Sequence, residues 1–291
     1  ASAMDAFCCG RPQNSPPARP DVWEHERNLA RFTGAGPSST VIKDFAHTWW
    51  EESILLEHEP IRQDLEDMDR IVRTRPEAFT PGSEAWRVTL FFRWFRRCFK
   101  PLVEQHHTFE ALVLFPWLKS KAATSFEPTQ FLLEHEQINS QLDAVEAHEI
   151  AISRTYNPQG RAEAVIKLLS DLNMLIYDMR NNMASEEMAI PKLIFGHFRR
   201  EEEIQFQRQV IENLGVKGNE RRIPWITFSM ERWAGHSYTR EWLNNSIPTT
   251  MKLLHDSVWR SNYEKEHRGM LQALEAQRPP PEHGEGSCVL S

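Results

Sequence analysis

The chain has 291 residues, of which 40% are apolar and 26% charged, and its formal net charge is −7. This length and apolar content suffice for one large domain or two small ones with a sizeable core. The acidic balance argues against a nucleic-acid partner and against a basic surface for anionic membranes. The four cysteines form no CxxC pair, so neither a disulfide framework nor a thiolate zinc site is indicated, and a reducing, cytoplasmic setting is expected.

Four parts follow one another along the chain. Residues 1–40 are rich in Pro, Ser, Gly and Ala without a sustained period, which predicts a disordered N-terminal segment. Residues 41–215 carry long helical periods, residues 216–276 form a further helical extension, and residues 277–291 are expected to be a flexible tail. Alternating β-branched segments are absent, so the predicted fold class is all-α. The expected helices span residues 44–73, 84–121, 128–155, 161–198, 201–213, 225–244 and 248–276.

Two segments nearly repeat each other. LLEHEPIRQDLEDM begins at Leu55 and LLEHEQINSQLDAV begins at Leu132. In each, one histidine, His58 or His135, occupies an apolar stripe with steps of three and four residues, which is the face of a helix that points into the core. A single core histidine is ordinarily satisfied by a neighbouring carbonyl or hydroxyl. Two histidines at equivalent positions favour a shared site.

The second long helix contains VEQHHTFEALVLFPWL. His106 and Glu110 stand four residues apart and therefore lie on one helix face, whereas His107 is rotated by about 100° and is expected to be peripheral. A buried carboxylate is costly unless it is paired or bound to a cation. Histidine and glutamate side chains that converge from several helices commonly form non-haem iron sites. The same buried face is expected to hold Phe99, Leu102, Val113 and Trp117.

The segments LLEHEPI, HHTFEALVLFPWL, LLEHEQI and EEMAIPKLIFGHF, in this order, resemble the hemerythrin-like family, also called the HHE cation-binding domain. The resemblance covers roughly residues 44–215. It implies a four-helix up-down bundle, here with additional C-terminal helices, that holds two bridged irons through histidines and carboxylates. Four of the family's ligand positions match His58, His106, Glu110 and His135.

The fourth helix departs from the family pattern of a histidine followed four residues later by a glutamate. Pro116 lies ten residues after His106, and the same count back from Pro191 gives Asn181, with Ser185 at the glutamate position. Neither residue is a good iron ligand. We prefer this count because it needs no gap.

A second count follows the apolar stripe of the fourth helix and places Asn182 and Glu186 on its inward face. Glu186 then remains a ligand, and Asn182 replaces the histidine. Glu187 is expected to be solvated under either count. Three imidazoles and one carboxylate can still hold one ion of iron or zinc, whereas reversible oxygen binding between two irons is disfavoured. The remaining interpretation is that the protein has lost its metal site and that the histidines are ordinary core residues.

The sequence ends in CVLS, which matches the C-a-a-X prenylation signal and favours a farnesyl group on Cys288. One lipid chain gives only marginal membrane attachment, so a second signal is expected. Cys8 and Cys9 can supply it by palmitoylation, and two ordinary exposed thiols are the equal alternative. These features predict peripheral attachment to the cytoplasmic face of a membrane.

The expected function is metal binding, with one or two iron ions as the cofactor, in the sensing or binding of metal or oxygen. The alternative is a metal-free helical adaptor that binds a protein partner through its tryptophan-rich C-terminal helices. Neither a nucleophile–base arrangement nor a phosphate-binding glycine loop is present, so no enzymatic activity is expected. The tryptophans of these helices are Trp225, Trp233, Trp242 and Trp259.

Overall fold

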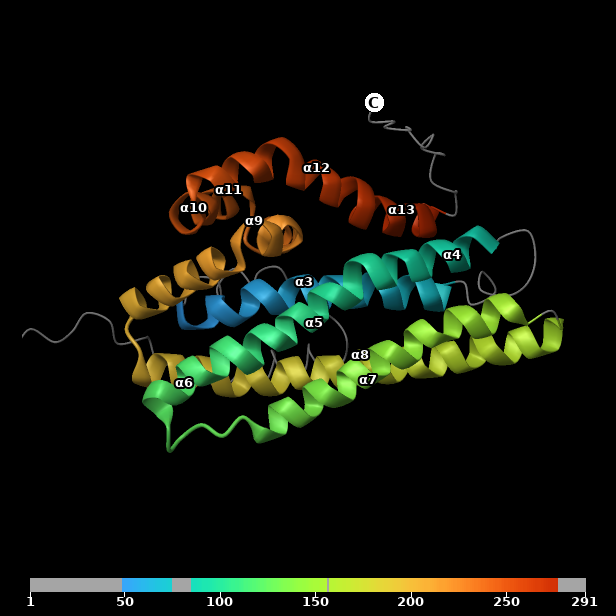
Figure 1. The fold of residues 1–291 in the computed structure, drawn as a ribbon, viewed down its shortest axis with the longest axis horizontal. Helices are drawn as coiled ribbons and strands as arrows, with labels where there is room; N and C mark the ends of the chain where they lie inside the picture. Colours follow the sequence, from blue (N-terminus) through green and yellow to red (C-terminus); the bar gives the residue numbers. More distant parts are fainter. Residues whose placement is uncertain (1–48, 75–84, 156, 277–291) are drawn as a thin grey trace, which may run out of the picture.

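The structure is a computed structural model that describes residues 49–74, 85–155 and 157–276 (Figure 1). Every regular element in these ranges is helical, which confirms the all-α class. No helix within them is long and apolar enough to cross a membrane. In chain order the elements are α3 (Trp49–Thr74), α4 (Ala85–Trp94), η2 (Phe95–Phe99), α5 (Lys100–Phe109), η3 (Glu110–Leu114), α6 (Phe115–Ala122), α7 (Thr129–Arg154), α8 (Pro158–His197), α9 (Arg200–Trp233), α10 (His236–Ser246), α11 (Thr249–Leu254), η4 (His255–Trp259), α12 (Arg260–Tyr263), η5 (Glu264–Arg268) and α13 (Gly269–Ala276).

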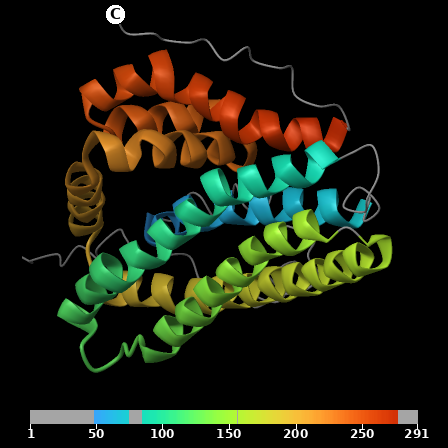
Figure 2. The same cartoon turned by 45° about the vertical axis from the view of Figure 1, so that its right-hand side comes forward.

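The first four predicted helices correspond to α3, the continuous run from α4 to α6, α7 and α8. These helices lie alongside one another (Figure 2), and one apolar core receives side chains from all of them. Its fully buried members include Leu65 and Met68 from α3, Leu142 from α7, and Leu168 and Leu175 from α8. The regular three- and four-residue spacing of these side chains buries one stripe of each helix.

The second long helix contains two π turns, η2 and η3. A π turn adds a residue to the helical repeat, so the buried stripe beyond it moves by one position. Leu114 at the end of η3 and Leu118 beyond it are buried, whereas Val113 is 38% exposed and Trp117 is only half-buried. The prediction that Val113 belongs to the buried face is therefore wrong, and the π turn is the physical reason.

The predicted helix at residues 225–244 is divided. Helix α9 instead runs from Arg200 to Trp233, with a kink at Gly215, and the chain turns at Gly235 before α10 begins. Gly215 has φ 60° and Gly235 has φ 89°. Glycine adopts this left-handed region without the steric penalty of a Cβ atom, so these two positions permit the changes of direction.

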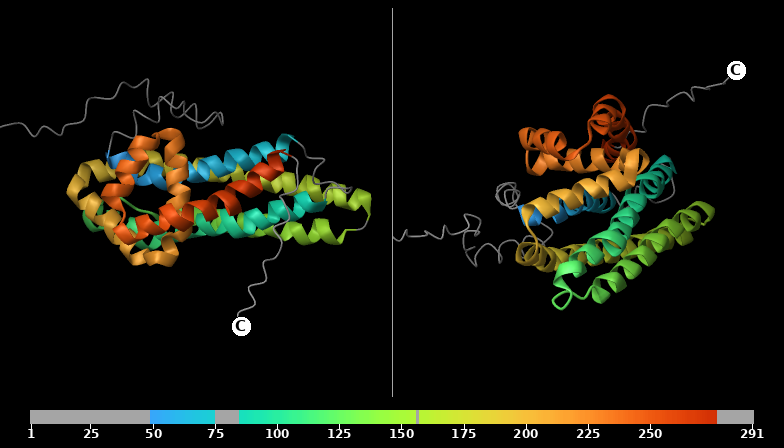
Figure 3. Two further views of the ribbon diagram at one scale, coloured as in Figure 1. Left: turned by 90° about the horizontal axis from the view of Figure 1, so that it is seen from above. Right: turned by 60° about the vertical axis from the view of Figure 1, so that its left-hand side comes forward.

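Helix α3 packs against both α8 and α9. The helices from α10 to α12 pack over α9, on the side away from α7, and α13 continues this layer over α4 and α3 (Figures 1 and 3). Polar residues of α3 are therefore buried and meet partners from the C-terminal helices: Asp64 accepts hydrogen bonds from Trp225 Nε1 and His267 Nε2, both at 2.9 Å. Both faces of α3 are thus internal.

Candidate metal centre

Five ionisable side chains converge in the interior from all four long helices. His58 comes from α3, His106 and Glu110 from the second helix, His135 from α7 and Glu186 from α8. None of the five is more than 4% exposed. Each occupies the core-facing stripe of its helix, which is why helices distant in sequence bring these groups together.

The donor atoms lie within contact distance of one another. His58 Nε2 is 3.2 Å from Glu186 Oε2 and 3.8 Å from Glu110 Oε1. Glu110 Oε2 lies 3.3 Å from Nε2 of both His106 and His135. His135 Nε2 also lies 2.9 Å from Glu186 Oε1. The two carboxylates therefore stand between the three imidazoles.

Several of these buried atoms have no hydrogen-bond partner among the described residues. They are His58 Nε2, both ring nitrogens of His106 and both oxygens of Glu110. Buried polar atoms are rarely left unsatisfied, because each costs about 1–3 kcal/mol. One donor atom from each of His58, His106, Glu110 and Glu186 lies within 4.8 Å of the other three. Donors around one ion at bond lengths of about 2.0–2.2 Å stand up to about 4.4 Å apart, so this set fits one metal ion after a small contraction.

The fourth helix follows the second count. Asn182 is 3% exposed and faces the centre with Glu186, whereas Asn181 is half-buried and Ser185 is exposed. The proline-anchored count, which we preferred, is therefore wrong. Asn182 Nδ2 donates to Glu186 Oε1 at 3.1 Å and to Glu134 Oε2 at 3.1 Å. The amide thus orients the Glu186 carboxylate.

The error of one residue has a structural cause. Glu110 and Pro116 are six positions apart, whereas Glu186 and Pro191 are five apart. The π turn η3 occupies the interval after Glu110, and α8 is α-helical over the equivalent stretch. The extra residue of the π turn makes the two prolines unequal reference points.

Glu187 lies inside the protein, contrary to the prediction that it is solvated. It is 3% exposed, and its Oε1 accepts hydrogen bonds from His58 Nδ1 at 2.9 Å and from Arg62 Nη2 at 2.8 Å. Because α8 packs along α3, the position after Glu186 also faces a helix. A carboxylate on Nδ1 fixes the tautomer and orientation of the imidazole, so that Nε2 faces the cluster.

His107 is also internal, and the prediction that it is peripheral is wrong. Its side chain is 4% exposed, and its ring stacks on that of His135 with centroids 4.2 Å apart and an interplanar angle of 9°. Nδ1 lies 2.9 Å from Asn139 Oδ1, so the rotation by about 100° turns the ring toward α7 instead of toward solvent. Asn139 follows His135 by four residues, a spacing visible in the sequence that we did not use.

Burial and charge set the protonation of the cluster. Burial, reinforced by the neighbouring histidines, lowers the pKa of His106 well below its usual range. Burial also opposes the charged form of His58, but the neighbouring carboxylates of Glu110, Glu186 and Glu187 raise its pKa well above 6.5. Burial, together with the charge of Glu186, raises the pKa of Glu110 to about 7.

The other two groups, His135 and Glu186, are linked by a hydrogen bond. Burial opposes both charges, yet the bond with Glu186 raises the pKa of His135, while His135 and His58 bring the pKa of Glu186 below its usual range. In the metal-free protein, the positive charges of the imidazoliums are therefore balanced by the negative charges of the neighbouring carboxylates.

The predicted lipidation sites Cys288, Cys8 and Cys9 lie outside the described residues, so lipidation stays a prediction. Within them, Trp225, Trp233 and Trp259 are buried in the C-terminal helices, and Trp242 is half-buried. The protein partner expected for these helices likewise stays a prediction.

Comparison of the chain with protein-family models, with curated proteins and with solved structures found no match. The function must therefore be derived from the residues of the centre.

Proposed function

We propose that this chain is a hemerythrin-like metal-binding protein in which α3, the run from α4 to α6, α7 and α8 form the four-helix bundle. The ligands are the three imidazoles and two carboxylates of the buried cluster. The observation that supports the proposal is the convergence of these groups from all four helices. Donor atoms of four of them lie within 4.8 Å of one another, and each of the four has a buried atom without a hydrogen-bond partner among the described residues: His58, His106, Glu110 and Glu186. The ligands are His58, His106, Glu110, His135 and Glu186.

Iron is the ion that this donor set fits best. Zinc in proteins prefers four tetrahedral ligands, whereas iron accepts larger mixed sets of imidazole and carboxylate. The amide of Asn182 stands where the family pattern has a histidine, so we propose one ion instead of a bridged pair. Bound iron supplies a redox-active centre for sensing metal or for binding a small ligand such as dioxygen.

Protonation, orientation and shielding of the three imidazoles suit them to bind a metal ion. His106 is already neutral and can bind without releasing a proton. Glu187, held by Arg62, orients His58. The rings of His107 and Phe115 lie against His135, with centroids 4.2 and 5.9 Å away, and exclude water from that side.

The alternative is a metal-free helical adaptor. The observation that favours it is the pairing of His58 and His135 with Glu186 and Glu187, which compensates the buried charges without an ion. Buried ion pairs of this kind can persist as structural elements.

Metal content distinguishes the two proposals. Protein purified without chelator from iron-supplemented cells should contain about one equivalent of iron, measured by mass spectrometry and by iron absorbance. His106→Ala should lose both signals. His255→Ala removes a buried histidine that pairs with Thr227 and Asp256 outside the cluster, and it should retain them. Less than about a tenth of an equivalent of any metal in the unmodified protein contradicts the metal-binding proposal.

A further inference from the structure

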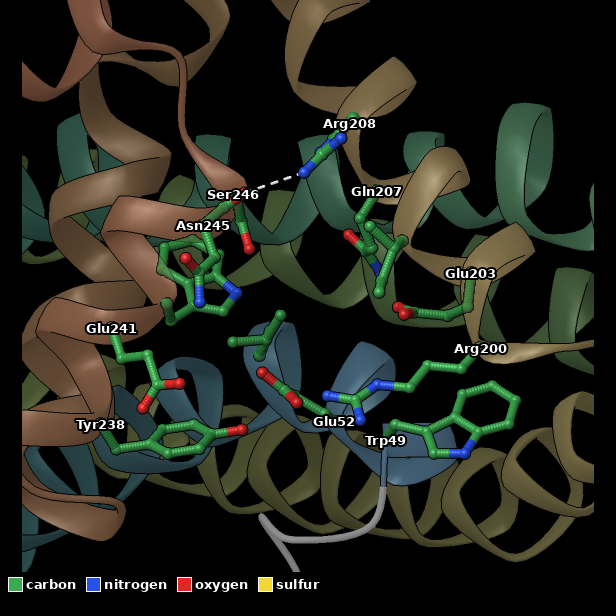
Figure 4. A pocket seen from close by; sticks show the side chains of 13 residues that line it. Trp49, Glu52, Arg200, Glu203, Gln207, Arg208, Tyr238, Glu241, Asn245 and Ser246 are labelled. Atoms are coloured by element: carbon green, nitrogen blue, oxygen red, sulfur yellow. Dashed lines mark hydrogen bonds between the residues drawn. The ribbon is translucent and has the colours of Figure 1, made fainter. Parts of the chain in front are cut away.

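A second site candidate lies away from the histidine cluster. A cavity of about 320 Å³ opens between the start of α3, the start of α9 and α10 (Figure 4). Ligand pockets in proteins begin near this volume, so the cavity suits a small molecule. None of the five proposed metal ligands lines it.

The walls of the cavity are partly apolar and aromatic. Trp49 and Leu56 line it from α3, and Trp242 lines it from α10. Indole faces attract organic cations through the quadrupole of the ring, and they also pack against methylene groups. The walls are therefore suited to an aliphatic chain that carries positive charge.

Three carboxyl groups enter the cavity from three different helices. Glu203 of α9 and Glu241 of α10 point in from opposite sides, and Glu52 of α3 lies between them (Figure 4). Glu52 also forms a hydrogen bond with the Tyr238 hydroxyl. The arrangement offers two separated anionic positions with apolar surface beside them.

Glu203 is the most buried of these groups. It is 7% exposed, and its Oε1 accepts a hydrogen bond from Ser53 Oγ at 2.5 Å. Burial, with the charge of Glu52, raises the pKa of Glu203 to about 7 despite that hydrogen bond. A cation placed beside Glu203 offsets the penalty for its ionised form.

Two arginines also line the cavity, and their charges partly offset those of its three carboxyl groups. Arg208 is exposed and donates to the backbone oxygen of Asn245 at 3.3 Å, so it spans the rim between α9 and α10. Arg200 is exposed and lowers the pKa of both Glu52 and Glu203. The charge of Arg200 offsets one of the three carboxylates, so the inside of the cavity keeps an excess of negative charge.

We propose that this cavity binds a short aliphatic diamine, with one ammonium group beside Glu203, the other beside Glu241, and the methylene chain against Trp242 and Leu56. The proposal does not depend on metal binding, because the two sites share no ligand residue.

Calorimetric titration at pH 8 with 1,4-diaminobutane tests it, because both amines are then charged and Glu203 is mostly ionised. The diamine should bind at least about tenfold more tightly than 1-aminobutane, and 1,4-butanediol should not bind. Equal binding of the diol, or preferential binding of a dicarboxylate such as succinate, overturns the proposal.

Matched variants locate the binding site. Glu203→Gln, which retains an oxygen to accept from Ser53, and Glu241→Gln, at an exposed position, should each weaken diamine binding about tenfold. Glu201→Gln alters an exposed carboxylate of the same helix and should leave binding unchanged. His106→Ala should also leave it unchanged. Absence of binding up to about 10 mM diamine, or unaltered affinity in Glu241→Gln, contradicts the proposed site.

Discussion

His58 Nδ1 donates a hydrogen bond to Glu187 Oε1 at 2.9 Å, so the two side chains join α3 to α8 directly behind the cluster. The same carboxylate oxygen accepts from Arg62. The bond leaves Nε2 of the imidazole directed toward Glu110 and Glu186. In the proposed metal centre, Glu187 therefore acts by positioning the ligand His58.

Replacing Glu187 should weaken metal binding without removing a ligand. Glu187→Gln removes a negative charge. That charge orients His58 and makes its Nε2 more basic, so its loss should lower the metal affinity about 10- to 100-fold. Competition with a chromophoric chelator measures the change. Glu136→Gln removes an exposed carboxylate of α7 and serves as the control. Equal affinity in the Glu187 variant and the control contradicts the positioning role.

Metal binding should release protons. The pKa values of His58 and His135 are raised in the metal-free protein and that of Glu110 is about 7, so the protons that these groups hold near neutral pH must leave before the groups can become ligands. Calorimetry in buffers of different ionisation enthalpy should report a net release of protons, at least about one per ion, and affinity should rise between about pH 6 and pH 8. An affinity independent of pH contradicts these ligand assignments.

The same shifts predict the stability of the metal-free protein. A folded-state pKa above the unfolded value of about 6.5 contributes stability that is complete below that pH and is lost as the pH rises through the folded value. The contribution of His58 and His135 to the free energy of unfolding should therefore decline on the alkaline side of about pH 6.5. His58→Gln should flatten this part of a urea-denaturation pH profile. A profile unchanged by the substitution contradicts the raised pKa assigned to His58.

The sequence predicted the four long helices well because their apolar stripes recur every three or four residues. It also placed His58 and His135 correctly inside the core, since each occupies such a stripe. The prediction of the register of the fourth helix failed because it was counted from the second helix, whose π turn has no clear signature in a single sequence. The predictions that Glu187 is solvated and that His107 is peripheral fail because helical periodicity describes one buried face, whereas packing against several neighbours can bury a second.

Asn182 lies four residues before Glu186, at the position that a histidine occupies in the proposed hemerythrin-like pattern. Asn182→His should restore the paired pattern of Glu110 with His106, and it should raise the iron content from about one to about two equivalents. Mass spectrometry of protein from iron-supplemented cells measures the ratio. Ser185→His, at an exposed position of the same helix, is the control. An unchanged ratio in Asn182→His shows that the missing imidazole is not what limits the site to one ion.

His107 should contribute to stability through packing and not through metal ligation. Burial lowers its pKa to about 4, and its ring stacks on His135. His107→Ala should lower the free energy of unfolding by about 2–4 kcal/mol, because it leaves a cavity beside the stacked ring, while His107→Phe should cost less. Both variants should retain bound metal in the content assay. Loss of the metal in His107→Phe identifies the imidazole as a ligand instead.

Asp64 should hold the C-terminal helices against α3. Its two carboxylate oxygens accept from Trp225 and His267, and all three side chains are buried. Asp64→Ala leaves both donors unsatisfied and should lower the free energy of unfolding by about 3–5 kcal/mol in urea denaturation. Asp69→Ala removes a more exposed ion pair with Arg73 in the same helix and should cost less than about 1 kcal/mol. Similar losses for the two variants contradict the role assigned to Asp64, because Asp69 pairs within α3, whereas Asp64 connects α3 to both α9 and η5.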